Sequence, residues 1–157
     1  NSTEKNYSGI WKRPMTMGTR TSQMAMLVVY ETGILTLCES PKIYENLPEF
    51  NFIKQVPVTW DSTIVLDGKI GEYIVIARKK DNKWFIGGMT DWQERDVKID
   101  FGFLEAGEYF AEIYSDASDA NTNPQNVQII KAEITGGVTK TFHMAKGGGL
   151  AMVLTKK

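Results

Sequence analysis

Two tryptophans, Trp84 and Trp92, stand on either side of a glycine pair that begins at Gly87, and exposed indole rings of this kind can stack on a sugar ring. The local pattern favours another role. Trp84 and Ile86 would share one face of a strand and Phe85 the other, as in a strand buried in a core. The small glycines indicate the close approach of another element. We therefore expect these tryptophans to pack inside the protein or between domains, with carbohydrate binding as the alternative.

Few other residues could bind a metal or a ligand or take part in catalysis. The single cysteine, Cys38, and the single histidine, His143, leave no Cys/His set of the kind that holds zinc. Residues 116–123 (DASDANTN) offer oxygen atoms without the spacing of an EF-hand, so we expect a solvated loop. The glycines of residues 146–150 (KGGGL) precede an expected strand and indicate a turn rather than a phosphate site. Glu31 lies on an apolar helix stripe, and we expect a neighbouring group to pair with it.

The composition excludes some classes of partner. The chain has 157 residues, 42% of them hydrophobic and 24% charged, which suffices for a folded domain. Its net charge of -1 gives no overall positive field, so we do not expect a nucleic-acid partner. No apolar run approaches the ~18 residues that a membrane-spanning helix needs, and we expect no such span.

Apolar side chains at helical spacing predict one helix over residues 21–40. Thr21 or Ser22 would be its N-cap, and Pro41 would end it. The predicted helix is apolar on two opposite sides, and such a helix needs cover on both. Because the remaining chain is small, we expect the second cover to come from outside it. One stripe comprises Met24, Leu27, Val28, Glu31, Leu35 and Cys38, and the other comprises Met26, Val29, Tyr30 and Leu37.

The apolar period changes to two after Pro57, which is typical of strands. Asp81 and Asn82 provide hairpin-turn chemistry between two such runs. The pattern predicts a mainly β fold: an antiparallel β-sandwich or barrel of about seven or eight strands, preceded by one or two helices. The expected strands are residues 71–80, 83–90, 95–101, 107–116, 126–135, 140–145 and 149–157.

Three segments resemble the C-terminal part of glycoside hydrolase family 97, a family of retaining or inverting α-glucosidases and α-galactosidases. Residues 14–45 (PMTMGTRTSQMAMLVVYETGILTLCESPKIYE) resemble the end of that family's catalytic (β/α)8 barrel. Residues 56–92, with WDSTIVLDG and GEYIVIAR, resemble the start of its C-terminal β-domain. Residues 145–155 (AKGGGLAMVLT) are similar to the glycine-rich turn before its last strand.

This resemblance implies that residues 1–55 are the end of the catalytic barrel and residues 56–157 the C-terminal β-sandwich domain. The catalytic carboxylates of the family, and a calcium ion held by glutamates, lie on earlier barrel strands. The resemblance therefore implies no catalytic residue, metal ligand or cofactor in this chain, and calcium in the full-length enzyme. It also implies a periplasmic or secreted protein. The implied partners are the rest of the glycosidase and a further copy in a homo-oligomer.

The loop of residues 12–20 would follow the last barrel strand, on the active-site face. Met15, Met17 and Arg20 are the candidate substrate-binding residues on this ground; otherwise the methionines fill gaps and Arg20 braces the loop. Many family members carry His where this chain has Ser22, so no role is carried over to that side chain. The expected function is a C-terminal part that supports the barrel and oligomerisation without activity of its own, and a carbohydrate-binding module is the alternative.

Overall fold

The computed structural model describes residues 1–12, 15–34, 36–37 and 41–157, and in these residues the chain is mainly β. The helices are α1 (Arg20–Val29), α2 (Pro41–Tyr44) and α3 (Phe50–Ile53). The strands are β1 (Ser62–Lys69), β2 (Tyr73–Lys80), β3 (Lys83–Thr90), β4 (Arg95–Asp100), β5 (Glu108–Asp116), β6 (Val127–Thr135), β7 (Thr139–Met144) and β8 (Gly149–Lys156). A short 3-10 turn, η1 (Phe101–Phe103), follows β4.

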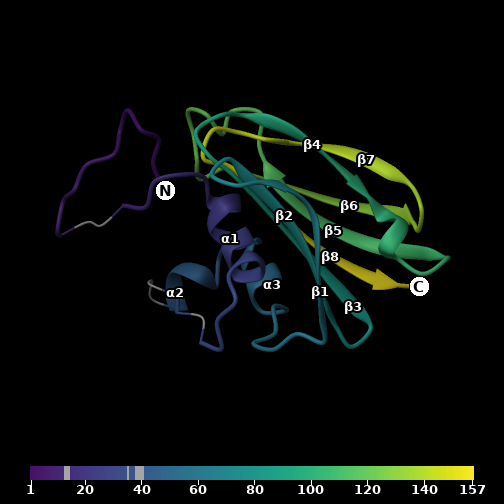
Figure 1. Ribbon diagram of the computed structural model, residues 1–157. Helices are drawn as coiled ribbons and strands as arrows, with labels where there is room; N and C mark the ends of the chain where they lie inside the picture. The colour runs from purple at the N-terminus through teal and green to yellow at the C-terminus, as the bar shows by residue number, and fades with distance from the viewer. Residues whose placement is uncertain (13–14, 35, 38–40) are drawn as a thin grey trace.

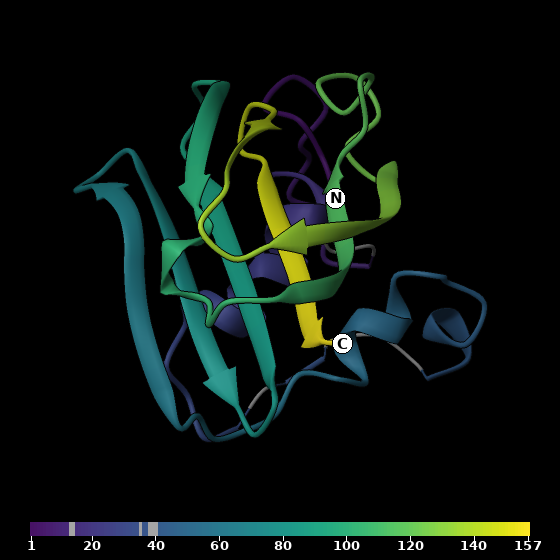
Figure 2. The ribbon, with the colours of Figure 1, turned by 90° about the vertical axis from the view of Figure 1, so that its right-hand side faces the viewer.

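The strands form two antiparallel sheets of unequal size, which confirms the predicted fold class. Six strands make the large sheet in the order β1-β2-β3-β8-β5-β6, and β4 pairs with β7 in the small one. The helices lie on one side of the large sheet and the β4–β7 pair lies on the other (Figure 1). Figure 2 shows the twist of the large sheet, with the C-terminal strand β8, in yellow, near its middle.

The first core lies between the two sheets. Trp84 and Ile86 of β3 point into it, and Phe85 points to the opposite face, as the alternation in the sequence predicted. Trp84 is only 9% exposed, and its ring packs edge-on against Phe103 with 4.9 Å between the ring centroids. The prediction that Trp84 packs in the core is thus confirmed.

The second core lies between the helices and the large sheet. Met24 and Val28 of α1 pack there with Phe85 of the sheet. The helix crosses so close to β3 that a Cβ atom at Gly87 would stand 2.9 Å from the carbonyl oxygen of Ala25. The glycine pair in β3 therefore permits the close approach that the sequence indicated.

The N-terminus of α1 differs from the prediction. Thr19, not Thr21 or Ser22, is the N-cap, because its Oγ1 accepts a hydrogen bond from the Ser22 backbone N–H at 3.0 Å. Its backbone is extended, as N-cap residues require. Thr21 and Ser22 are instead buried residues of the first turn.

The C-terminus of α1 is the larger correction, since the helix ends at Val29 and not near residue 40. Tyr30 already has an extended backbone. Thr32 Oγ1 accepts a hydrogen bond from the Ile34 N–H at 3.2 Å, a local turn that competes with helical bonding. Gly33 lowers the helix propensity further. The predicted helix is therefore correct for its first nine residues and wrong from Tyr30, and two members of its stripe, Leu35 and Cys38, lie outside the described residues.

Candidate functional site

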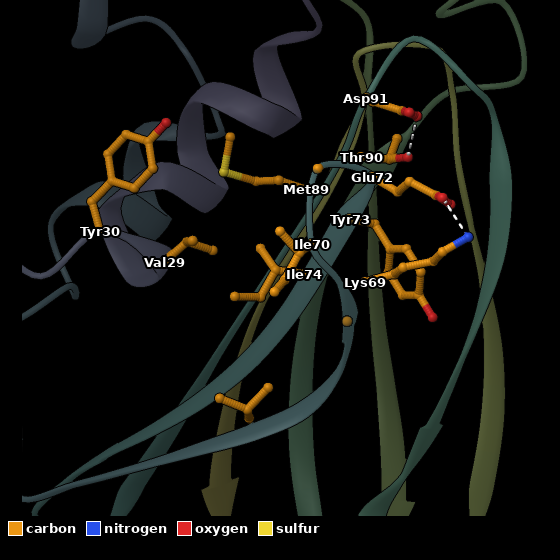
Figure 3. A pocket seen from close by; sticks show the side chains of 13 residues that line it. Val29, Tyr30, Lys69, Ile70, Glu72, Tyr73, Ile74, Met89, Thr90 and Asp91 are labelled. Carbon is orange, nitrogen blue, oxygen red and sulfur yellow. Dashed lines mark hydrogen bonds and ion pairs between the residues drawn. The ribbon is translucent and has the colours of Figure 1, made fainter.

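An apolar groove with a volume of about 680 Å³ lies between the end of α1 and the β1–β2 hairpin (Figure 3). We call it the hairpin groove. It lies on the same side of the large sheet as the helices, where β2 and β3 form its floor. The residues that line it are Val29, Tyr30, Val65, Gly68, Lys69, Ile70, Gly71, Glu72, Tyr73, Ile74, Met89, Thr90 and Asp91.

Apolar side chains at the rim of this groove face solvent. Ile70, at the tip of the hairpin, is fully exposed, and Val65 is 63% exposed. Tyr30, just after α1, is 54% exposed. Ile34 continues the apolar surface along the chain and is 81% exposed. A cluster of exposed apolar side chains around a hollow is typical of a surface that another polypeptide covers.

The polar end of the groove is built around Arg95. Its Nη2 lies 3.0 Å from Asp91 Oδ1, its Nη1 lies 3.3 Å from Glu72 Oε2, and its Nε donates to Thr90 Oγ1 at 2.7 Å. The guanidinium also lies over the Tyr73 ring, 4.7 Å from the centroid. One cation thus holds two carboxylates, a hydroxyl and an aromatic ring in place.

Both carboxylates at this end are stabilised as ions. Lys69, and then Arg95, hold the pKa of Glu72 below its ordinary value of 4.5. The backbone N–H of Gln93, followed by Arg95, lowers the pKa of Asp91 from its ordinary value of 3.8, against an opposing effect of partial desolvation. A general acid for glycoside hydrolysis needs a raised pKa. The ion pairs with Lys69 and Arg95 thus anchor the hairpin, and neither carboxyl has the raised pKa of a general acid.

The three candidate substrate-binding residues lie in the N-terminal segment and do not reach this groove. Met15 is half-buried and lines a shallow hollow formed by residues 7–11. Met17 is 49% exposed. Arg20 turns its Nη1 to Glu49 Oε1 at 2.7 Å, an ion pair between the start of α1 and the N-terminus of α3. Arg20 thus joins the start of α1 to α3, and the substrate-binding role of the three residues stays a prediction.

The remaining tryptophans divide into packed and exposed. Trp60 packs edge-on against Phe85 at 5.4 Å, with the Arg78 guanidinium 5.6 Å from its ring. Trp92 lies against the glycine-rich turn, where a Cβ atom at Gly147 would stand 2.8 Å from its ring. Trp11, by contrast, is 96% exposed.

The sequence did not predict two buried charged side chains that bond to backbone groups of distant segments. Arg78 is 3% exposed and donates to the Val29 carbonyl at 3.3 Å, so it places a positive charge at the C-terminus of α1. The position of Arg78 in the β-branched strand pattern did not predict that its side chain is buried. Glu31, which we expected to pair with a neighbouring group, forms a long ion pair with Arg78 of β2 at 4.0 Å, although its own side chain is 90% exposed.

Asp116 is the second buried charge, 6% exposed, at the point where we expected a solvated loop. Its Oδ2 accepts hydrogen bonds from the backbone N–H groups of Ala145 and Gly149, each at 2.9 Å. The glycine-rich turn therefore bends around a carboxylate of its own chain. His143, on β7, pairs across to Asp96 at 2.8 Å on the surface.

The described residues contain no group of three or more His, Cys, Asp or Glu side chains that could hold a metal ion. None of the helices in the described part of the chain is long and apolar enough to cross a bilayer. What the geometry offers is thus an apolar contact surface with an ionic anchor.

Comparison with known proteins decides the family. Residues 59–155 match the family described as glycosyl-hydrolase 97 C-terminal, oligomerisation. The chain belongs to this family. The match begins just before β1 and ends at the penultimate residue of β8, so it includes both sheets except the last residue of that strand.

Two relatives are named as galactosidases. The chain is 39% identical over 153 residues to a retaining α-galactosidase of Bacteroides thetaiotaomicron, covering 97% of this chain and 23% of that protein. It is 29% identical over 132 residues to a probable retaining α-galactosidase of Streptomyces bingchenggensis, covering 83% of this chain and 20% of that protein. This member of the family 97 C-terminal domains thus spans less than a quarter of these relatives.

Solved structures of family 97 enzymes contain the same fold. A family 97 enzyme from Pseudoalteromonas sp. strain K8, solved in complex with panose, superposes with a TM-score of 0.84 at 35% identity, over 89% of this chain and 23% of that one. The same enzyme has been solved with acarbose. A β-arabinopyranosidase superposes with a TM-score of 0.66 at 22% identity, which shows a shared fold alone.

Proposed function

We propose that this chain is the non-catalytic C-terminal part of a retaining α-galactosidase of glycoside hydrolase family 97. The observation that carries the proposal is the match of residues 59–155 to the family's C-terminal oligomerisation domain, together with the 39% identity to a retaining α-galactosidase. The two carboxylates of the hairpin groove support it, since Arg95 binds both of them and neither is poised as an acid.

The proposal gives different roles to two parts of the chain. We assign residues 1–55 to the end of the catalytic barrel and residues 56–157 to the β-sandwich domain. The hairpin groove, with exposed Tyr30 and Ile70 at its rim, would be covered by the upstream catalytic part. Its position at the end of α1 supports this, because α1 would be the last barrel helix.

The remaining parts of the proposal concern the larger enzyme. Met15 and Met17 would lie near the active-site face, with Arg20 as the brace of the same loop. Calcium would be held by glutamates of the upstream barrel, as the resemblance to the family implies. The enzyme would be periplasmic or secreted, and its C-terminal domains would join copies of the enzyme.

Two measurements test this function. The 157-residue chain alone should not hydrolyse aryl α-galactosides or aryl α-glucosides above a blank, and turnover would overturn the non-catalytic assignment. The same chain should bind the separately produced upstream part of the enzyme in isothermal titration. Ile70→Asp or Tyr30→Asp should weaken that binding by about tenfold, because each places a charge in an apolar contact.

The matched control is Val58→Asp, since Val58 is 58% exposed but does not line the groove. Its affinity for the upstream part should equal that of the unmodified chain. Equal weakening by all three substitutions, or by none, would contradict the assignment of the groove.

A further inference from the structure

We propose that the outer edge of β6 joins two copies of this chain, so that their large sheets form one continuous antiparallel sheet. The inference rests on the proposed function, because it assigns a surface to the oligomerisation that the family's description names. Three features of the sheet support it: a difference between its two edges, the exposure of β6, and the order of the charges in β6.

The two edges of the large sheet differ in how they are protected. In β1 the register shifts between Val65 and Asp67, which marks a β-bulge, and the edge also carries Gly68 and Lys69. A bulge of this kind interrupts the regular edge and opposes pairing with another strand. In β6 the register with β5 is continuous from Val127 to Thr135, without glycine or proline. An edge of nine regular residues is a template for another strand.

The outer edge of β6 is open. In the described part of the chain β6 pairs with β5 alone, and β7 pairs with β4. Residues 128–131 are exposed on both faces of the strand, so a second strand meets no obstacle from either face. Ile129 and Ile130 are each 39% exposed, one on each face. Pairing at this edge would remove apolar surface from water.

The order of charges in β6 selects one register. Two antiparallel strands related by a two-fold axis place each residue opposite a residue of the same face. With the axis at Ala132, Lys131 lies opposite Glu133 of the second copy, and Glu133 lies opposite Lys131 of the second copy. An axis at Lys131 or at Glu133 would instead bring two like charges together, which is unfavourable. The sequence of β6 is thus self-complementary about its alanine.

The same register also suits the apolar side chains. Ile130 would lie opposite Ile134 of the second copy, and Ala132 opposite the Ala132 of the second copy, on the face that carries the β4–β7 pair. A small side chain at the axis leaves room for the two isoleucine pairs beside it. The two six-stranded sheets would become one sheet with all helices on one side.

Charge reversal in β6 tests the register. The unmodified 157-residue chain should dimerise in sedimentation equilibrium. Lys131→Glu and Glu133→Lys should each raise the dissociation constant by about tenfold or more, because each creates two like-charge pairs in the dimer. The double variant Lys131→Glu/Glu133→Lys restores opposite charges and should restore dimerisation. Lys98→Glu, at an exposed lysine of β4, is the matched control and should leave the dissociation constant unchanged.

Thermal unfolding of each variant separates dimerisation from folding. This control is needed because Lys131 also lies opposite Glu112 of β5, and Glu133 also binds Lys157 of the same chain. Amide hydrogen exchange adds an independent measurement. At rising protein concentration, protection should increase at the β6 amides that do not bond to β5, and should stay constant along β1.

The outcomes distinguish this inference from the function on which it rests. A dimer that persists in both single reversals, or a double variant that fails to recover, overturns the β6 assignment and leaves the oligomerisation function intact. A chain that stays monomeric at every concentration overturns both the β6 assignment and self-association, whereas binding to the upstream part would survive. If the single reversals abolish binding to the upstream part and leave dimerisation unchanged, β6 contacts the catalytic part. That outcome would also overturn the inference.

Discussion

Among single residues, Arg95 shows how this domain uses its charges. Its guanidinium joins β4 to the β1–β2 hairpin through Glu72 and to the end of β3 through Asp91. The hairpin carries the exposed Ile70, so this ion cluster holds an apolar contact surface in position. Charged side chains with structural partners of this kind keep carboxylates ionised, which suits an anchor and opposes acid catalysis.

The ion cluster predicts a pH dependence of stability. A carboxyl group whose pKa is lower in the folded state stabilises the fold above its unfolded pKa, and this contribution is lost as the pH falls through the folded pKa. Glu72 and Asp91 both have lowered pKa values, from 4.5 and 3.8. The free energy of unfolding should therefore fall as the pH drops below about 4.5. Asp91→Asn should be less stable at pH 7 and show a shallower fall below pH 4.5.

Urea unfolding at several pH values measures this dependence. A steeper fall in Asp91→Asn than in the unmodified chain would contradict the sign of the Asp91 contribution. Identical stability at pH 7 would show that the Asp91–Arg95 contact contributes nothing.

Individual side chains were the least predictable part of the sequence. Trp84 was placed correctly, because a large apolar residue in alternation with Ile86 has one plausible face. Arg78 and Asp116 were not, since charged residues are almost never fully buried without partners. Arg78 bonds to the backbone of Val29, and Asp116 bonds to the backbone of Ala145. Contacts between such distant segments cannot be predicted from local residue spacing.

Among the elements, the contact of α1 with β3 depends most on one small residue. A Cβ atom at Gly87 would lie 2.9 Å from both the Ala25 carbonyl oxygen and the Val28 Cβ, and a backbone oxygen cannot move aside cheaply. Gly87→Ala should therefore lower the free energy of unfolding by about 1–3 kcal/mol, the usual cost of overpacking. Urea unfolding with an unchanged m-value would measure it.

Gly88→Ala is the matched control for this prediction. The nearest atoms to a Cβ at Gly88 lie 3.4 Å away, in the side chains of Leu150 and Met144. Its effect should stay within about 1 kcal/mol, because side chains adjust and alanine restricts the unfolded chain. Equal destabilisation by the two substitutions would show that Gly87 is not needed for the close contact between α1 and β3.

The predicted strand ends agree with the structure where side chains alternate without interruption along the strand. The prediction for residues 83–90 matches β3, and those for the strands after it match to within one residue at nearly every end. Strand β1 was not predicted as a strand, because its bulge between Val65 and Asp67 breaks the alternation. Helix α1 was overestimated, because apolar periodicity continues past the point where Thr32 forms its own turn. Both errors arise where a local contact overrides periodicity.

For the whole molecule, the exposed apolar surface falls into separate regions with different chemistry. The hairpin groove presents a hollow with an ionic anchor, which suits side chains of another domain. The β6 edge presents backbone groups in a regular row, which suits another strand. A domain with both surfaces can bind its own catalytic part and a second copy at once, because the groove lies at the β1 edge and β6 lies at the opposite edge of the sheet.

The alternative function, a carbohydrate-binding module, predicts a different use of the surface. Sugar platforms are exposed aromatic rings. Trp84 is buried against Phe103, and the partly exposed Trp60 and Trp92 are engaged with Phe85 and the glycine-rich turn. Titration with maltooligosaccharides or α-galactosides should therefore leave the tryptophan emission of the chain unchanged.

Trp11 makes this titration decisive, because its ring is 96% exposed and would report a bound sugar directly. A saturable change in emission that disappears in Trp11→Phe would establish a sugar site on the N-terminal segment. A change that survives Trp11→Phe would mean that a packed tryptophan senses sugar, and the binding-module function would then replace the supporting one. Flat emission in both proteins is expected, since the hairpin groove and the open edge of β6 are surfaces suited to polypeptide.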